Sequence, residues 1–103
     1  MEHYEIVISK KAQQNLYDIY KYIAVNLSSP ENAAKQYYRI KEAVLSLNTM
    51  PKRVPLSKLQ PFCNIKLRQL IVDNYSVFFY IKENNVMITN IIYTASNLLK
   101  NLT

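Results

Sequence analysis

A chain of 103 residues, half of them hydrophobic, has room for one packed core, so we expect a single domain over residues 1–103. Its composition excludes several chemistries: no glycine is present for a phosphate-binding loop, and one cysteine and one histidine are too few for an internal disulfide or a Cys/His metal centre. The net charge of +6 and the short apolar runs favour a soluble cytoplasmic protein without metal or cofactor that meets an anionic partner and no membrane.

Positive charge is concentrated in one part of the sequence. Residues 43–72 contain five basic residues and no aspartate or glutamate, whereas residues 1–42 and 73–103 are nearly neutral. Such a region raises the rate of encounter with a polyanion or an acidic partner, but it does not choose between them. The alternative interpretation is a solvated basic loop without a partner.

The first half of the sequence predicts a strand followed by two helices. Apolar and polar residues alternate over residues 4–9, which is the pattern of a strand with one face towards the core. Ser9 then begins a helix with an apolar stripe formed by Ala12, Leu16, Ile19, Tyr20, Ile23 and Leu27. Ser29 can cap a second helix, and Pro30 fits its first position. The stripe of this second helix, which ends near Asn48, is Ala33, Tyr37, Ile40, Val44 and Leu47.

The second half predicts a meander of three strands after a proline-containing loop over residues 49–64. The strands are expected at residues 65–72, 75–82 and 86–93, and the tail from Ala95 to Leu102 as a short helix. Because glycine is absent, turns with positive φ are expected to fall to asparagine, at Asn26, Asn48, Asn74, Asn84 and Asn85. The predicted fold class is therefore α+β: an N-terminal strand, an α-helical hairpin, a three-stranded antiparallel meander that completes a four-stranded sheet, and a short C-terminal helix.

Five short motifs stand in order along the chain. They are Tyr4-Glu5-Ile6-Val7-Ile8-Ser9 followed by Ala12 and Leu16, Ser29-Pro30 before Ala33-Ala34, Met50-Pro51-Lys52-Arg53-Val54-Pro55, Arg68-x-Leu70-x-Val72-x-Asn74-Tyr75-x-Val77-Phe78-Phe79-Tyr80, and Ile91-Ile92-Tyr93. With the predicted order of elements, they resemble the RelE/ParE superfamily of small bacterial toxins from type II toxin-antitoxin operons. The resemblance spans almost the whole chain.

The resemblance implies a growth-arresting toxin that a cognate antitoxin keeps silent, and it implies one of two targets. RelE-like members cut messenger RNA on the ribosome, whereas ParE-like members poison DNA gyrase without being nucleases. Our first hypothesis is a ribosome-dependent mRNA endonuclease. The alternative is a gyrase inhibitor, or a weakened toxin that only binds its antitoxin. The antitoxin is expected to cover the basic surface and the sheet or helical hairpin with a helix and an extended acidic stretch.

The same resemblance assigns candidate site residues for RNA cleavage. That reaction needs a group to take the 2'-hydroxyl proton, a proton donor and cations for the phosphate charge. Arg68 matches an arginine that contacts the scissile phosphate, and Tyr93, at the end of the last strand, is the second candidate catalytic residue. For Arg68 the alternative is an exposed strand arginine without such a role. Contacts to RNA or phosphate are assigned to Lys52, Arg53, Lys58 and Lys66.

The sequence departs from the family pattern after the last predicted strand. Many relatives carry basic residues there, whereas this chain reads Tyr93-Thr94-Ala95-Ser96-Asn97. The C-terminal tyrosine of RelE-like enzymes is also absent, and Lys100 is the candidate to supply a missing contact. Losing one transition-state contact lowers a rate by about 10²- to 10³-fold. The departure therefore leaves both the nuclease and the gyrase hypotheses open.

Overall fold

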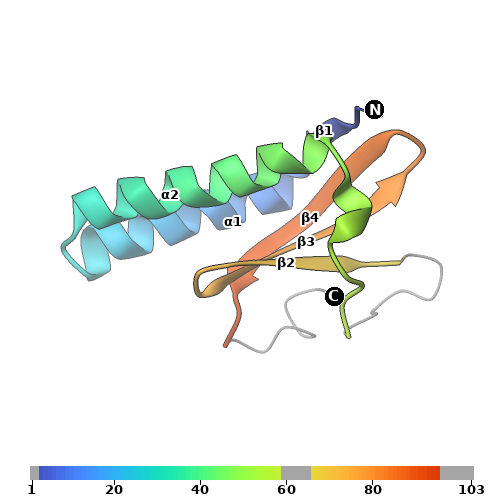
Figure 1. Cartoon of the computed structure of the whole chain (residues 1–103). Helices are drawn as coiled ribbons and strands as arrows, with labels where there is room; N and C mark the ends of the chain where they lie inside the picture. The colour runs from blue at the N-terminus through green and yellow to red at the C-terminus, as the bar shows by residue number, and fades with distance from the viewer. Residues whose placement is uncertain (1–2, 59–65, 96–103) are drawn as a thin grey trace.

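The chain forms two layers, in which a pair of helices packs on one face of a mixed β-sheet (Figure 1). The computed structural model describes residues 3–58 and 66–95. In chain order these residues form β1 (Glu5–Ile8), α1 (Lys10–Lys21), α2 (Pro30–Leu45), β2 (Arg68–Val72), β3 (Tyr75–Lys82) and β4 (Asn85–Tyr93). The α+β fold class is confirmed. The predicted C-terminal helix lies outside the described residues, apart from Ala95.

The strand order in the sheet is β1-β4-β3-β2. Strands β2, β3 and β4 form the predicted antiparallel meander, and β1 pairs in parallel with β4, so the helical hairpin is the crossover between the first strand and the meander. A β-bulge opposite Phe78 and Phe79 places Thr89 as the extra residue on β4. Within residues 3–58 and 66–95, no helix is long and apolar enough to cross a membrane.

The main core lies between the helices and the sheet. Phe79 and Phe78 are adjacent on β3 and both are fully buried, but Phe79 belongs to this core and Phe78 packs with Leu67 and Ile92. Because neighbouring strand residues point to opposite faces, the sheet buries apolar side chains on both sides. The buried members of the main core are Tyr4, Ala12, Ile40, Val44, Leu47, Val54, Val72, Val77, Phe79, Val86, Ile88 and Ile91.

The two helix starts differ in how they are capped. The Ser9 hydroxyl accepts a hydrogen bond from the Ala12 N–H at 3.0 Å, which is the expected cap of α1. Ser29 holds the equivalent place before α2, but its side chain makes no cap bond because its backbone (φ −135°, ψ 72°) is not in the extended geometry of Ser9. Pro30 occupies the first helical position as predicted. Between the helices, α1 continues into a π-helical turn over Tyr22–Asn26.

Asparagine was the wrong prediction for the turns with positive φ. Among the described residues, φ is positive at Ser28, Met50, Asp73 and Glu83. In both two-residue hairpin turns the positive φ falls on the first turn residue, an acidic one, and not on the following asparagine. At Asp73 the cost of the positive φ is offset by hydrogen bonds that Gln36 and Arg39 of α2 donate to its carboxylate.

An ion pair ties the β2–β3 turn to α2. The Arg39 Nε and Nη2 atoms donate to the two oxygens of the Asp73 carboxylate at 2.7 and 2.8 Å, and the Gln36 amide donates to Oδ2 at 3.0 Å. The hydrogen bond from Arg39, and then that from Gln36, hold the pKa of Asp73 below its ordinary value of 3.8. These bonds thus join the helical hairpin to the turn between β2 and β3.

This ion pair predicts a pH dependence of stability. Because the pKa of Asp73 is lower in the folded chain than in the unfolded one, its contribution is fully present above the ordinary carboxyl pKa and is lost as pH falls through the folded value. The effect should be modest, since Arg39 and Asp73 are exposed to solvent. We expect Asp73→Asn to reduce the acid sensitivity of urea unfolding midpoints between about pH 5 and pH 2. Equal acid sensitivity in both proteins would contradict this.

Candidate functional site

The structure gathers the five predicted basic residues along one edge of the sheet. The segment after α2 passes through a short helical turn at Pro51–Arg53 and then pairs with the start of β2 through a bridge between Leu56 and Arg68. Lys52, Arg53, Lys58 and Lys66 are exposed, and Arg68 is half-buried. We call residues 52–58, 66 and 68 the basic edge.

The guanidinium of Arg68 faces the neighbouring backbone. Its Nη1 atom donates to the carbonyl of Val54 at 2.6 Å and to that of Lys52 at 3.2 Å. These bonds connect the first residue of β2 to the helical turn that carries Lys52. Arg68 therefore has a structural use, whereas its phosphate contact stays a prediction from the sequence.

Arg53 also binds backbone oxygens. Its Nη1 atom donates to Thr49 O at 2.8 Å and to Met50 O at 3.0 Å, and Nη2 donates to Ser46 Oγ at 3.1 Å. Carbonyls after a helix carry partial negative charge, so a guanidinium is stabilising there. Both arginines of the basic edge thus direct donors at backbone oxygens, whereas its lysines carry their charge at exposed positions.

Tyr93 lies away from the basic edge. It pairs with Tyr75 in the sheet, and the two rings make an edge-to-face contact with centroids 5.8 Å apart. Burial raises the pKa of the Tyr75 hydroxyl, and nearby Tyr93 and Tyr22 add to the shift. Arg68 pairs instead with Phe79, from β2 on the other side of β3. Phe79 is four residues beyond Tyr75, so the two pairs are about 13 Å apart along the strand. The structure does not bring Arg68 and Tyr93 together.

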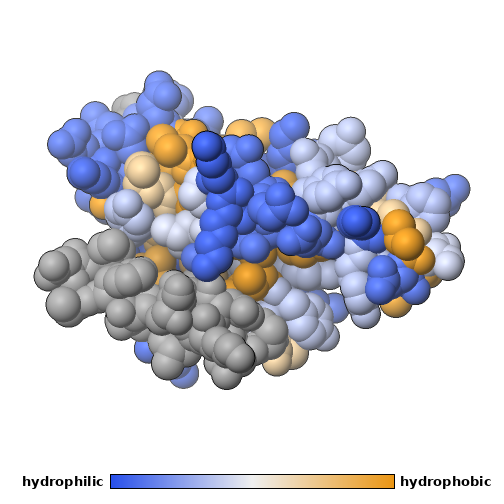
Figure 2. All heavy atoms as spheres, turned by 180° about the vertical axis from the view of Figure 1, so that it is seen from behind, coloured by the Kyte–Doolittle hydropathy of each residue, from blue (hydrophilic) through white to orange (hydrophobic). Residues whose placement is uncertain are grey.

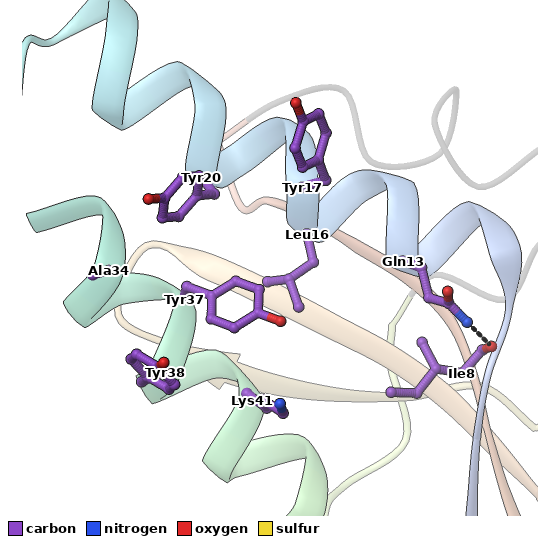
Figure 3. A pocket seen from close by; sticks show the side chains of 9 residues that line it. All are labelled: Ile8, Gln13, Leu16, Tyr17, Tyr20, Ala34, Tyr37, Tyr38 and Lys41. Carbon is purple, nitrogen blue, oxygen red and sulfur yellow. Dashed lines mark hydrogen bonds between the residues drawn. The ribbon is translucent and has the colours of Figure 1, made fainter. Parts of the chain in front are cut away.

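A groove between the two helices was missed by the sequence reasoning. It has a volume of about 550 Å³, and Figure 3 shows the Tyr37 ring lying between the helices beside Leu16. Tyr37 makes edge-to-face contacts with Tyr20 at 6.1 Å and with Tyr38 at 5.5 Å, and Lys41 Nζ lies 5.8 Å from its ring centroid. The residues that line the groove are Ile8, Gln13, Leu16, Tyr17, Tyr20, Ala34, Tyr37, Tyr38 and Lys41.

The helical hairpin also exposes apolar side chains at its tip. Val25 and Leu27 are 65% and 57% exposed, and no charged residue stands between Lys21 and Glu31. Figure 2 shows hydrophobic atoms at the end of the molecule where the two helices are joined. Most of the exposed large hydrophobic residues in the described part of the chain belong to this hairpin. Exposed apolar surface of this kind is typical of a protein interface.

Comparison with known families identifies the chain. A family model described as "ParE toxin of type II toxin-antitoxin system, parDE" matches residues 6–98. The chain belongs to this ParE toxin family. It is therefore a toxin of a type II toxin-antitoxin system, and the resemblance to the RelE/ParE superfamily is confirmed. No curated protein sequence gives a significant match.

Solved structures share the fold of this ParE-family toxin. A chromosomal ParDE system from P. aeruginosa matches with a TM-score of 0.74 and 24% identity, over 88% of this chain and 96% of that one. The archaeal RelE–RelB complex from Pyrococcus horikoshii OT3 gives 0.62 and 16%, over 91% and 98%. The RelBE2 toxin-antitoxin complex from Mycobacterium tuberculosis gives 0.59 and 16%, over 88% and 98%. These neighbours are a ParDE system and two RelE–RelB-type complexes, and what this chain shares with them is the fold.

Proposed function

We propose that this toxin acts by binding DNA gyrase and not by cutting messenger RNA. The match to the ParE family carries this proposal, because ParE-like members of the superfamily are the gyrase poisons. It reverses the preference drawn from the sequence, in which RNA cleavage stood first. Cleavage of mRNA is the competing outcome of the test below.

The geometry of the candidate residues supports a binding mechanism. General acid–base cleavage of RNA requires the proton acceptor, the proton donor and the phosphate-binding cation to meet around one phosphate. Arg68 lies on β2 opposite Phe79, whereas Tyr93 lies on β4, on the other side of β3 and opposite Tyr75. In addition, Arg68 Nη1 is hydrogen-bonded to two backbone carbonyls. A toxin that only has to hold its target needs no such convergence.

The basic edge is the surface that we assign to the target. Lys52, Lys58 and Lys66 are exposed there, in a region of the sequence without acidic residues. Gyrase works on DNA, so a positive surface raises the rate at which the toxin meets the enzyme–DNA complex. This contribution should weaken as the salt concentration rises.

We assign the groove between α1 and α2 to the antitoxin. Its aromatic lining suits the apolar side chains of an amphipathic helix, and tyrosines are frequent energetic centres of such interfaces. Lys41 at the groove offers a partner for an acidic residue of that helix. In this arrangement hydrophobic anchors supply most of the affinity, and the acidic stretch of the antitoxin covers the basic edge.

Two reactions with the purified chain test the proposed target. In a supercoiling reaction with gyrase, the toxin is expected to inhibit the enzyme. In a reconstituted translation reaction, primer extension is expected to show intact mRNA with and without ribosomes. Ribosome-dependent cuts within codons, together with normal supercoiling, would instead establish the nuclease.

A further inference from the structure

Most of the basic edge belongs to the loop that follows α2, whose described part ends at Lys58. Several hydrogen bonds join this loop to the sheet. The Ser57 N–H donates to Leu67 O at 2.8 Å, and the Gln69 N–H donates to Pro55 O at 3.3 Å. The Ser57 hydroxyl donates to Gln69 Oε1 at 3.1 Å. Together with the Leu56–Arg68 bridge, these bonds extend the sheet by one short segment beyond β2.

We propose that Arg68 is a positioning residue, which fixes this loop so that its lysines and Lys66 are held in place for target binding. The inference rests on the proposed function in taking the exposed lysines as the charges that meet the target. Arg68 Nη1 reaches Lys52 O, within the helical turn, and Val54 O, directly after it. One nitrogen thus connects the lysine-bearing turn to the edge strand.

A strained residue, Met50, directly precedes the helical turn that Arg68 holds. Met50 has φ 50° and ψ 47°, a left-handed conformation that non-glycine residues adopt at a cost. Such a conformation persists when the surrounding contacts determine it. Arg53 donates hydrogen bonds to the carbonyl of Met50 and to that of the preceding residue, Thr49. Pro51, directly after Met50, is buried. Arg68 holds the same turn from the other side, at its exit.

The consequence is a division of labour between arginine and lysine. A guanidinium offers several donors in a rigid plane, so it suits a bridge between fixed carbonyls, whereas an ammonium on a flexible stem is a mobile point charge. Arg68 and Arg53 use their donors on the loop, and Lys52, Lys58 and Lys66 present charge to solvent. Fixing the backbone before binding lowers the ordering cost of the complex.

Hydrogen exchange combined with gyrase inhibition tests this role. In Arg68→Ala, the Ser57 and Gln69 amides are expected to exchange about tenfold faster or more, because a hydrogen bond to a charged group contributes on this scale. Inhibition should weaken in parallel. The Gln13 amide, bonded to Ser9 O in α1, serves as the control for overall folding. Arg68→Lys is expected to restore part of both properties, since an ammonium can donate to the same carbonyls.

A triple variant separates position from charge. Lys52→Ala with Lys58→Ala and Lys66→Ala should lose inhibition while the Ser57 and Gln69 amides keep wild-type exchange. If Arg68→Ala loses inhibition with unchanged exchange, the arginine acts directly on the target and the proposal is wrong. Full inhibition despite fast exchange would also overturn it. If the wild-type chain does not inhibit gyrase, the proposed target fails, and growth arrest on expression becomes the readout of the same comparison.

Discussion

Replacing Tyr37 with alanine is expected to weaken antitoxin binding by about thirtyfold or more, the effect of removing one energetic centre of an interface. Tyr37 contacts two further tyrosines of the groove and lies beneath Lys41, so its loss removes the middle of the proposed docking surface. Isothermal titration calorimetry with the purified antitoxin measures the change directly.

The matched control is Tyr22→Ala. Tyr22 is 53% exposed and belongs to the π-helical turn, outside the residues that line the groove. We expect its affinity for the antitoxin to stay within about threefold of wild type, because Tyr22 lies outside the groove to which the antitoxin is assigned. Equal losses in both variants, or no loss in Tyr37→Ala while the fold is intact, would move the antitoxin away from the groove.

Replacing Phe79 with alanine should lower the free energy of unfolding by about 3–5 kcal/mol. The side chain is fully buried in the main core between the helices and the sheet, so its removal leaves a cavity in addition to the lost transfer energy. This loss is large beside the total of about 5–15 kcal/mol for a domain. Urea unfolding of the purified toxin measures it.

Val7→Ala provides the comparison for that experiment. Val7 lies on β1 and is 41% exposed, so truncating it should cost well under about 1.5 kcal/mol. A similar loss of unfolding free energy in both variants would mean that the exposed fraction of a side chain does not distinguish core from surface positions in this fold. A loss under about 1 kcal/mol in Phe79→Ala would contradict the placement of Phe79 at the centre of the core.

Local patterns were sufficient to predict the order of the α-helices and strands that the structure describes. Alternation over residues 4–9 predicts β1, and Ser9 caps α1 as expected because its cap bond spans only three residues. The backbone conformations of the turns were harder to predict from the sequence. Asp73 tolerates a positive φ next to a bidentate bond from Arg39, a residue 34 positions earlier, and no local pattern predicts that contact. Propensity alone favoured the neighbouring Asn74.

The candidate sites were harder to predict than the fold. Tyr20 and Tyr37 follow helical spacing, and a stripe of this kind fits a buried face as well as a groove between two helices. Tyr17 and Tyr38, which stand next to that stripe, were the available signal that the aromatic surface is wider than a core face needs. Arg68 was found through the family resemblance, but its bond to Val54 O joins residues 14 apart, so its structural use required the fold.

The decisive measurement for the proposed target is DNA supercoiling by purified gyrase at increasing concentrations of this toxin, with and without the antitoxin. We predict dose-dependent inhibition that the antitoxin reverses at about one equivalent per toxin, with weaker inhibition at high salt because exposed lysines contribute to the encounter. Unchanged supercoiling at toxin concentrations that arrest growth would contradict the proposed target.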